Sequence, residues 1–176
     1  AIRPNTSQEI LNNLKLVFDQ QGTITAGTAS PLTDGASATL VCNEEYAKKN
    51  NLDILARIVS TAVQGCPPEL MGLGPIEATK KALKRADLSI KDIDVIELNE
   101  AFASQSLACI ESLNIDPAKV NIDGGAIALG HPLGATGARI TAKAAQILKR
   151  ENKKYALATQ CIGLGQGIAT ILEKYE

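Results

Sequence analysis

The stretch Ile93-Asp-Val-Ile-Glu-Leu-Asn-Glu-Ala-Phe-Ala103 passes from an apolar strand pattern into the start of a helix, and it decides the fold class. Residues Ile93–Glu97 are predicted to form a short strand, and Glu100–Leu113 a helix with one apolar face. Strand and helix patterns alternate on both sides of this stretch. Such alternation favours a layered α/β fold with a parallel or mixed sheet.

The other predicted elements follow outward from this stretch. Further helices are predicted at Gln8–Val17, Glu44–Lys49, Pro75–Ala86 and Ala135–Arg150. Further strands are predicted at Ala36–Cys42, Ile54–Val63, Tyr155–Thr159 and Ile168–Leu172. The last two strands follow one another without a helix between them, which argues for one antiparallel pair.

Composition narrows the class of protein. The 176 residues are 45% hydrophobic and 21% charged with a net charge of −1, so no broad field points to nucleic acid or to an anionic membrane. No apolar run reaches the roughly 18 residues of a transmembrane helix. The four cysteines are widely spaced and there is one histidine, which argues against a metal site or a redox motif. We expect free thiols in a reducing cytoplasm.

A glycine-rich stretch, Gly124-Gly-Ala-Ile-Ala-Leu-Gly-His-Pro-Leu-Gly-Ala-Thr-Gly-Ala-Arg139, places five glycines around His131, just ahead of a helix. Glycines permit close approach of a ligand, and a helix N-terminus presents free N–H groups. The stretch matches neither a Walker loop nor GxGxxG. A structural histidine in a tight loop is the alternative, but the crowding glycines favour a functional one.

Three shorter stretches are also candidates. Cys161 opens the turn Cys161–Gly167, where a thiol can act as nucleophile or proton carrier, or can be a buried apolar group. Asn99 follows a strand, where its side chain can cap a helix or line a site, and the spacing favours neither. Met71–Pro75 is predicted to be a loop that starts a helix.

Together these segments resemble the second half of the thiolase family. The family's NEAF, GGAIALGHPxGxTG, CxGGGxG, MGxGP and TAGNAS-x-x-DGA motifs have counterparts at Asn99–Phe102, Gly124–Gly137, Cys161–Gly167, Met71–Pro75 and Thr25–Ala36. Their order and separations agree, and the match spans nearly the whole chain. Departures are Thr28 for Asn, Leu164 for Gly, and the segment Pro31-Leu-Thr-Asp34.

The resemblance implies an α/β half with a mixed five-stranded sheet covered by helices. Residues 1–34 would be the tail of a loop domain that covers CoA, and residues 35–176 the C-terminal thiolase domain. The family's acyl-accepting cysteine matches none of the four cysteines, so we expect it in an N-terminal half that acts as partner. Family members form homodimers or homotetramers, and an isolated half is expected to be inactive and to self-associate.

The resemblance also implies an activity: Claisen condensation of two acetyl-CoA to acetoacetyl-CoA and CoA, or the reverse thiolysis. By resemblance Cys161 is the acid/base, and His131 activates the nucleophile and polarises the thioester oxygen. Asn99 would hold a water that donates to the same oxygen, and the Gly163 N–H would stabilise a tetrahedral oxyanion. No cofactor is implied, because CoA is substrate or product.

Contacts with CoA are implied at residues from several parts of the chain. Ser30 and Ala26 would flank the pantetheine, Met71 and Phe102 would lie near the acyl end, and Arg3 would lie near the phosphates. Leu14, Val17 and Phe18 are candidates for the adenine side, with simple helix packing as an equal alternative.

Four functions stay open from the sequence. An acetyl-CoA acetyltransferase is the first expectation, and a 3-ketoacyl-CoA thiolase of fatty-acid breakdown is the second. The absent nucleophile motivates a third, a non-catalytic CoA-binding or assembly module. An unrelated nucleotide-binding α/β domain is the fourth.

Overall fold

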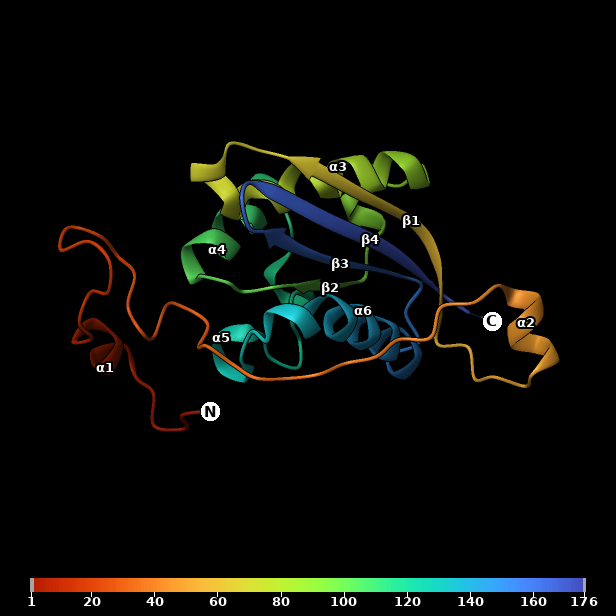
Figure 1. Ribbon diagram of the computed structural model, residues 1–176, viewed down its shortest axis with the longest axis horizontal. Helices are drawn as coiled ribbons and strands as arrows, with labels where there is room; N and C mark the ends of the chain where they lie inside the picture. Colours follow the sequence, from red (N-terminus) through yellow and green to blue (C-terminus); the bar gives the residue numbers. More distant parts are fainter. Residues whose placement is uncertain (1, 176) are drawn as a thin grey trace.

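The computed structural model describes residues 2–175, in which a four-stranded mixed sheet lies between two layers of helix (Figure 1). The strands are β1 (Ala56–Gly65), β2 (Val95–Leu98), β3 (Tyr155–Ile162) and β4 (Gln166–Lys174). Their order across the sheet is β1-β4-β3-β2. Strand β4 runs antiparallel to β3, which confirms the predicted C-terminal pair. It also runs antiparallel to β1, and β2 runs parallel to β3.

Helices cover both faces of this sheet: α3 (Gly74–Ala86) and α4 (Ala103–Ser112) lie on one face and α6 (Leu133–Arg150) on the other. The other helices are α1 (Gln8–Asn12), α2 (Glu44–Lys49) and α5 (Ala126–Leu129), with 3-10 turns at Pro68–Leu73, Ile90–Asp92 and Pro117–Lys119. Proline at its second residue starts α3, and Asp87 with φ 55° ends it. None of the helices within residues 2–175 is long and apolar enough to span a membrane.

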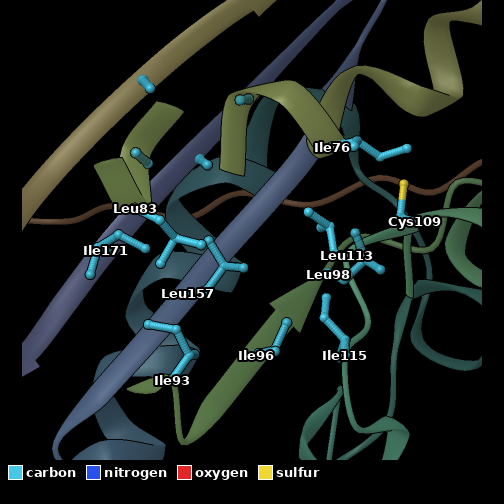
Figure 2. Close-up of a cluster of buried hydrophobic side chains, with 14 residues drawn as sticks. Ile76, Leu83, Ile93, Ile96, Leu98, Cys109, Leu113, Ile115, Leu157 and Ile171 are labelled. Atoms are coloured by element: carbon cyan, nitrogen blue, oxygen red, sulfur yellow. The ribbon is translucent and has the colours of Figure 1, made fainter. Parts of the chain in front are cut away.

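The core consists of two clusters, one on each face. Strand β2 is buried throughout, so its side chains alternate between the clusters: Ile96 and Leu98 face α3 and α4, and Val95 faces α6. Figure 2 shows the first cluster, which is lined by Ile76, Leu83, Ile93, Ile96, Leu98, Cys109, Leu113, Ile115, Leu157 and Ile171. The second cluster is entirely aliphatic and consists of Val95, Ile140, Ala144, Ala145, Ile147, Leu148, Ala156, Ala158 and Leu172.

The expectation of five strands is wrong, because Ala36–Cys42 forms no strand among the described residues. This segment, orange in Figure 1, runs along α6 to α2, and Ser37 Oγ donates to the Ala135 carbonyl oxygen over 2.7 Å. An alternating pattern forms a strand only where a neighbouring strand completes its hydrogen bonds. No such neighbour lies beside it within residues 2–175.

The outer edge of β2 is closed by a side chain instead of a strand. Ile96 and Val120 form a single parallel bridge, and Asn121 then turns the chain with φ 47°. The Asn121 Oδ1 accepts from the Leu98 N–H over 3.0 Å, and its Nδ2 donates to the Leu98 carbonyl oxygen over 2.9 Å. An amide side chain thereby satisfies the backbone groups that a further strand would satisfy.

Residues 2–34 form an arm that reaches the end of the sheet. Its helix was predicted to run to Val17 but ends at Asn12. The apolar residues Leu11 and Leu14 cover Gly27, whose added Cβ would lie 2.6 Å from each. The arm then bridges from Ala29 to Phe102 and from Leu32 to His131.

Candidate active site

Two of the predicted site residues lie at the carboxyl ends of neighbouring strands. In the parallel pair of β2 and β3, Leu98 is opposite Thr159, and the Asn99 N–H donates to the Thr159 carbonyl oxygen over 3.0 Å. Cys161 follows two residues later, opposite Gly167 of β4. Asn99 and Cys161 therefore lie at the same end of the sheet, the edge formed by the carboxyl ends of β2 and β3. Ligands bind at this edge in many open α/β folds.

His131 joins this edge through its side chain. Its Nε2 lies 3.3 Å from Asn99 Nδ2, and its Nδ1 lies 2.7 Å from Thr136 Oγ1. The Thr136 hydroxyl donates its one proton to the Pro132 carbonyl oxygen over 3.0 Å, so it accepts from Nδ1–H. This arrangement assigns the proton to Nδ1 and leaves a lone pair on Nε2, the state of a base.

The surroundings keep this imidazole neutral. Burial lowers the pKa of His131 below its ordinary 6.5, and the Arg139 charge lowers it further. The backbone N–H of His131 donates to Thr33 Oγ1 over 3.3 Å, which ties the histidine to the arm. Gly130 has φ 105°, and an added Cβ would lie 2.5 Å from the same hydroxyl, so glycine is required there.

Cys161 is half-buried, and burial raises the pKa of its thiol, with Cys66 adding to the increase. The thiol is therefore protonated at neutral pH. The following turn contains Leu164 with φ 68° and Gly165 with φ 89°. The Gly165 carbonyl oxygen accepts from the Cys66 N–H over 2.8 Å, which joins the turn to the end of β1. Gly163, the predicted oxyanion donor, is exposed.

The predicted acyl-end residues lie in segments that contact this edge. Gly74 packs on β4, since an added Cβ would lie 2.3 Å from the Gln166 carbonyl oxygen, and this places the Met71 turn beside the start of β4. Ser30 donates to the Ala101 carbonyl oxygen from its N–H (3.0 Å) and its hydroxyl (3.1 Å), next to Phe102.

The remaining predicted CoA contacts lie farther out on the arm. Ala26 is exposed there, and Arg3 is exposed near the beginning of the arm. The contacts described above bring neither of them to the edge that holds Asn99. Leu14 and Val17 lie beyond the end of α1 at Asn12, so they do not share one helical face.

The suggestion that Asn99 caps a helix is wrong. Helix α4 begins after Phe102, and no side chain caps it. The sequence reasoning also missed Glu100 and Asn121, whose side chains meet at 2.8 Å beside Asn99. The position of Glu100, directly after the site asparagine, was the available signal, but its pairing with Asn121 depends on the tertiary fold.

A separate cavity of about 710 Å³ lies between the segment Ala38–Asn43, the start of β1 and α6. Its lining is mainly apolar and includes none of the predicted site residues. Within residues 2–175 no group of three or more His, Cys, Asp or Glu side chains is placed to hold a metal ion.

Comparison with known families agrees with this geometry. The model of the thiolase C-terminal domain matches residues 52–174, and that of the thiolase N-terminal domain matches residues 1–45. The chain belongs to the thiolase family. The matches cover the arm, the sheet and the edge that holds Asn99, His131 and Cys161.

Individual thiolases are similar over the whole chain. A 3-ketoacyl-CoA thiolase of Vibrio vulnificus is 56% identical over 178 residues, which cover 99% of this chain and 46% of the relative. The crystal structure of human mitochondrial 3-ketoacyl-CoA thiolase in complex with CoA is 50% identical, with a TM-score of 0.92 over 99% of this chain and 44% of that one. The acetyl-CoA acetyltransferase of Bacillus anthracis is 43% identical, with a TM-score of 0.95 over 98% of this chain and 44% of that one. The chain thus spans about half the length of the thiolases it matches.

Proposed function

We propose that the chain is the C-terminal part of a 3-ketoacyl-CoA thiolase, which cleaves a 3-ketoacyl-CoA with CoA into acetyl-CoA and a shortened acyl-CoA. The observation that carries the proposal is the shared edge at which Asn99 contacts His131 beside the strand of Cys161. The names of the Vibrio and human relatives favour this activity over the acetyl-CoA acetyltransferase expected first. The Bacillus structure keeps the latter as the second candidate.

In the proposed reaction His131 acts first as a base. The Nε2 lone pair takes the proton of an acyl-accepting cysteine, which then attacks the 3-keto carbonyl. The neutral state of His131 at pH 7 and its Nδ1–H bond to Thr136 support this role. None of the four cysteines matches the family's nucleophile, so we propose that an N-terminal half supplies it.

Cys161 is proposed to move the second proton. When the bond between the second and third acyl carbons breaks, the acetyl-CoA enolate takes the proton of the Cys161 thiol. The resulting thiolate then takes the proton of the incoming CoA, whose sulfur attacks the acyl-enzyme. The raised pKa of Cys161 supports this order, because the resting thiol is already in the donor form.

Asn99 and Gly163 are proposed to stabilise the oxyanions. Asn99 Oδ1 is buried and has no hydrogen-bond partner, which leaves it free to accept from a water that donates to the thioester oxygen. Protonated His131 would be the second donor to this oxygen, and the Gly163 N–H would serve the other tetrahedral intermediate.

CoA is proposed to lie against residues 1–34, as the tail of a covering loop domain. Ser30 and Ala26 would flank the pantetheine, Met71 and Phe102 the acyl end, and Arg3 the phosphates. The hydrogen bond from the Ser30 hydroxyl to the Ala101 carbonyl oxygen, beside Phe102, supports the assignments of Ser30 and Phe102. A dimer or tetramer of the complete protein, and a cytoplasmic location, stay predictions.

Thiolysis by the protein that includes the N-terminal half tests these roles. We expect Cys161→Ser and His131→Ala to lower kcat by about 10²- to 10⁴-fold without loss of folding, because each removes a proton carrier. The control is Cys42→Ser, since Cys42 is exposed and lies away from the edge. Turnover within a few-fold of wild type in either site variant would overturn its assigned role.

The same assay separates the candidate functions. A 3-ketoacyl-CoA thiolase should cleave substrates of several chain lengths, whereas activity confined to acetoacetyl-CoA would favour the acetyltransferase. Stable assembly of two halves with no thiolysis would favour a non-catalytic module.

A further inference from the structure

The loop that leads to His131 is tied to the end of β2 by Asn121. As described above, the Asn121 amide bonds both backbone groups of Leu98, so its orientation is fixed. Its Nδ2 also donates to Glu100 Oε1 over 2.8 Å. A flipped amide would lose these bonds, so Asn121 presents a donor to Glu100 and holds that carboxylate in place.

The second oxygen of Glu100 holds the glycine-rich loop. Its Oε2 accepts from the Ile127 N–H over 3.0 Å. Gly125 lies directly against the carboxylate, since an added Cβ would lie 2.0 Å from the Glu100 Cδ. Three residues after Ile127 the chain reaches Gly130, and then His131.

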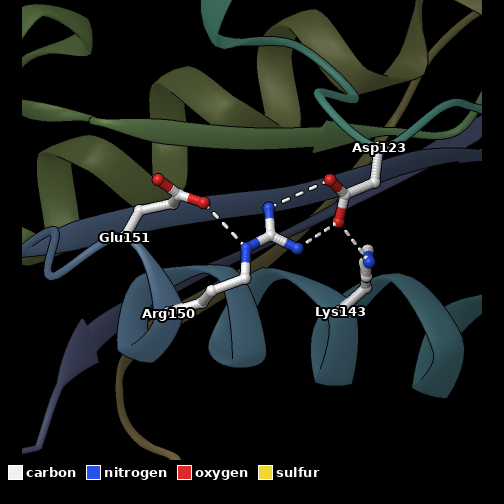
Figure 3. Close-up of polar contacts among 4 residues, drawn as sticks. All are labelled: Asp123, Lys143, Arg150 and Glu151. Atoms are coloured by element: carbon white, nitrogen blue, oxygen red, sulfur yellow. Dashed lines mark hydrogen bonds and ion pairs between the residues drawn. The ribbon is translucent and has the colours of Figure 1, made fainter.

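The opposite side of the same loop is tied to α6. Figure 3 shows the Asp123 carboxylate accepting from Arg150 Nη1 (2.7 Å) and Nη2 (2.9 Å) and pairing with Lys143. These cations hold the pKa of Asp123 well below its usual range, so Asp123 stays ionised and paired with Arg150 and Lys143 at neutral pH. With one side tied to β2 and the other to α6, the loop has little freedom to shift.

We propose that Glu100 is a positioning residue that sets where His131 stands relative to Asn99. Asn99 and Glu100 are adjacent in the chain: the first contacts the imidazole, and the second holds the loop that carries it. A closed ring of contacts therefore runs from Asn99 through His131 and Ile127 to Glu100. The catalytic role of these contacts rests on the proposed thiolase function, whereas the contacts themselves are independent of it.

Position and charge predict opposite effects on His131. The groups around the imidazole are Asn99, Thr136, the arm residue Thr33 and the cationic Arg139, which is the charged group that acts on it. If Glu100 acted only through its negative charge, its removal would lower the pKa of His131. If Glu100 acts through position, its removal lets the ring reach water, and the pKa rises toward the ordinary 6.5.

The experiment uses the one histidine of the chain, so its imidazole signals need no assignment to a residue and only Nδ1 and Nε2 must be told apart. The ¹⁵N shifts of the imidazole are followed against pH in wild type, Glu100→Gln and Glu100→Ala. Glu111→Gln, an exposed residue of α4, is the matched control. Wild type and control should show the Nδ1–H tautomer and a depressed pKa. The Glu100 variants should show mixed tautomers and a pKa closer to 6.5.

An unchanged tautomer in folded Glu100→Gln, or a fall in the pKa of His131, would overturn the proposal. Gly125→Ala supplies an independent arm, because its φ of −113° suits alanine while the new methyl collides with Glu100. It should shift His131 in the same direction, and by less in a Glu100→Ala background, where the methyl has room. Should Glu100→Ala fail to fold, Glu100→Gln and Gly125→Ala carry the test.

These readouts do not depend on turnover, so the two proposals fail separately. A wild-type tautomer and pKa of His131 in the Glu100 variants would contradict the positioning role alone. Absence of thiolysis by the assembled wild-type protein would sink the thiolase reaction alone.

Discussion

Glu97 is a carboxyl whose ionisation the fold opposes. It lies on the α6 face of β2, is 3% exposed, and its Oε1 has no hydrogen-bond partner. Burial raises its pKa to about 7, although the charges of Lys143 and Arg139 act in the other direction. The side chain is therefore largely protonated in the folded protein at slightly acidic pH.

This burial makes stability depend on pH. Between pH 4.5 and about 7 the unfolded chain ionises Glu97 while the folded protein keeps it protonated, so the free energy of unfolding falls as pH rises. We expect Glu97→Gln to raise the free energy of unfolding by on the order of 1–3 kcal/mol at pH 8. It should change little at pH 4.5. Urea unfolding at both pH values measures this.

The matched control for this prediction is Glu77→Gln, because Glu77 is exposed on α3. It should show no gain at pH 8. A Glu97→Gln gain of equal size at both pH values would mean that the ionisation of Glu97 is not the cause.

Among elements, α3 and β4 pack with their backbones in direct contact. Two glycines make it possible: an added Cβ on Gly74 would lie 2.3 Å from the Gln166 carbonyl oxygen, and one on Gly167 would lie 2.1 Å from Gly74. The backbones therefore touch without side chains between them. This contact places the loop before α3 next to the strand that pairs with Cys161.

We expect Gly74→Ala to lower the free energy of unfolding by about 1–3 kcal/mol, because the methyl forces α3 off β4. Gly134→Ala is the comparison, since Gly134 lies in the first turn of α6 with no atom within 4 Å of an added Cβ. Alanine favours a helix, so this change should be neutral or stabilising by up to about 1 kcal/mol. Thermal unfolding of both variants decides, and similar losses would contradict the packing argument.

Elements with a strong local pattern were predictable from the sequence. The helix predicted at Ala135–Arg150 and observed at Leu133–Arg150 has its inward residues at helical spacing, and it requires no information from elsewhere. The segment Ala36–Cys42 has a strand pattern but lacks a partner within the described residues. Pairing is a tertiary property, so alternation alone overpredicted the sheet.

The site was predictable as a set of motifs but not as a geometry. Glycines around His131 marked it as a functional candidate, and the structure joins it to Asn99. The tautomer depends on Thr136, which the sequence reasoning did not consider. The left-handed backbone conformation of Leu164 was also unpredictable, since residues other than glycine rarely adopt it.

At the scale of the whole molecule, one apolar surface has no cover in the described residues. Leu40 and Val41 are 72% and 67% exposed on the segment that failed to form a strand. They lie beside the apolar cavity between this segment and α6. Neighbouring exposed apolar residues favour association with another protein surface.

We therefore expect the isolated chain to self-associate, and the double variant Leu40→Lys/Val41→Lys to reduce this. Sedimentation velocity over a range of concentrations measures it. Leu107→Lys is the control, because Leu107 is 64% exposed on α4 away from this segment. If all three proteins associate equally, another surface is responsible.

The two edge strands of the sheet, β1 and β2, differ in how readily they can pair with a strand of another molecule. Beside β2 the Asn121 amide occupies the backbone groups of Leu98, so an incoming peptide has no free donors or acceptors to copy at that point. Beside β1 no neighbouring strand lies within the described residues, although Lys81 and Arg85 of α3 donate to the Val63 and Thr61 carbonyl oxygens. The register of β1 also shifts between Ile58 and Ser60. Edge-to-edge pairing should therefore use β1, and because each copy offers one open border, such pairing should stop at two copies and not extend into a fibre.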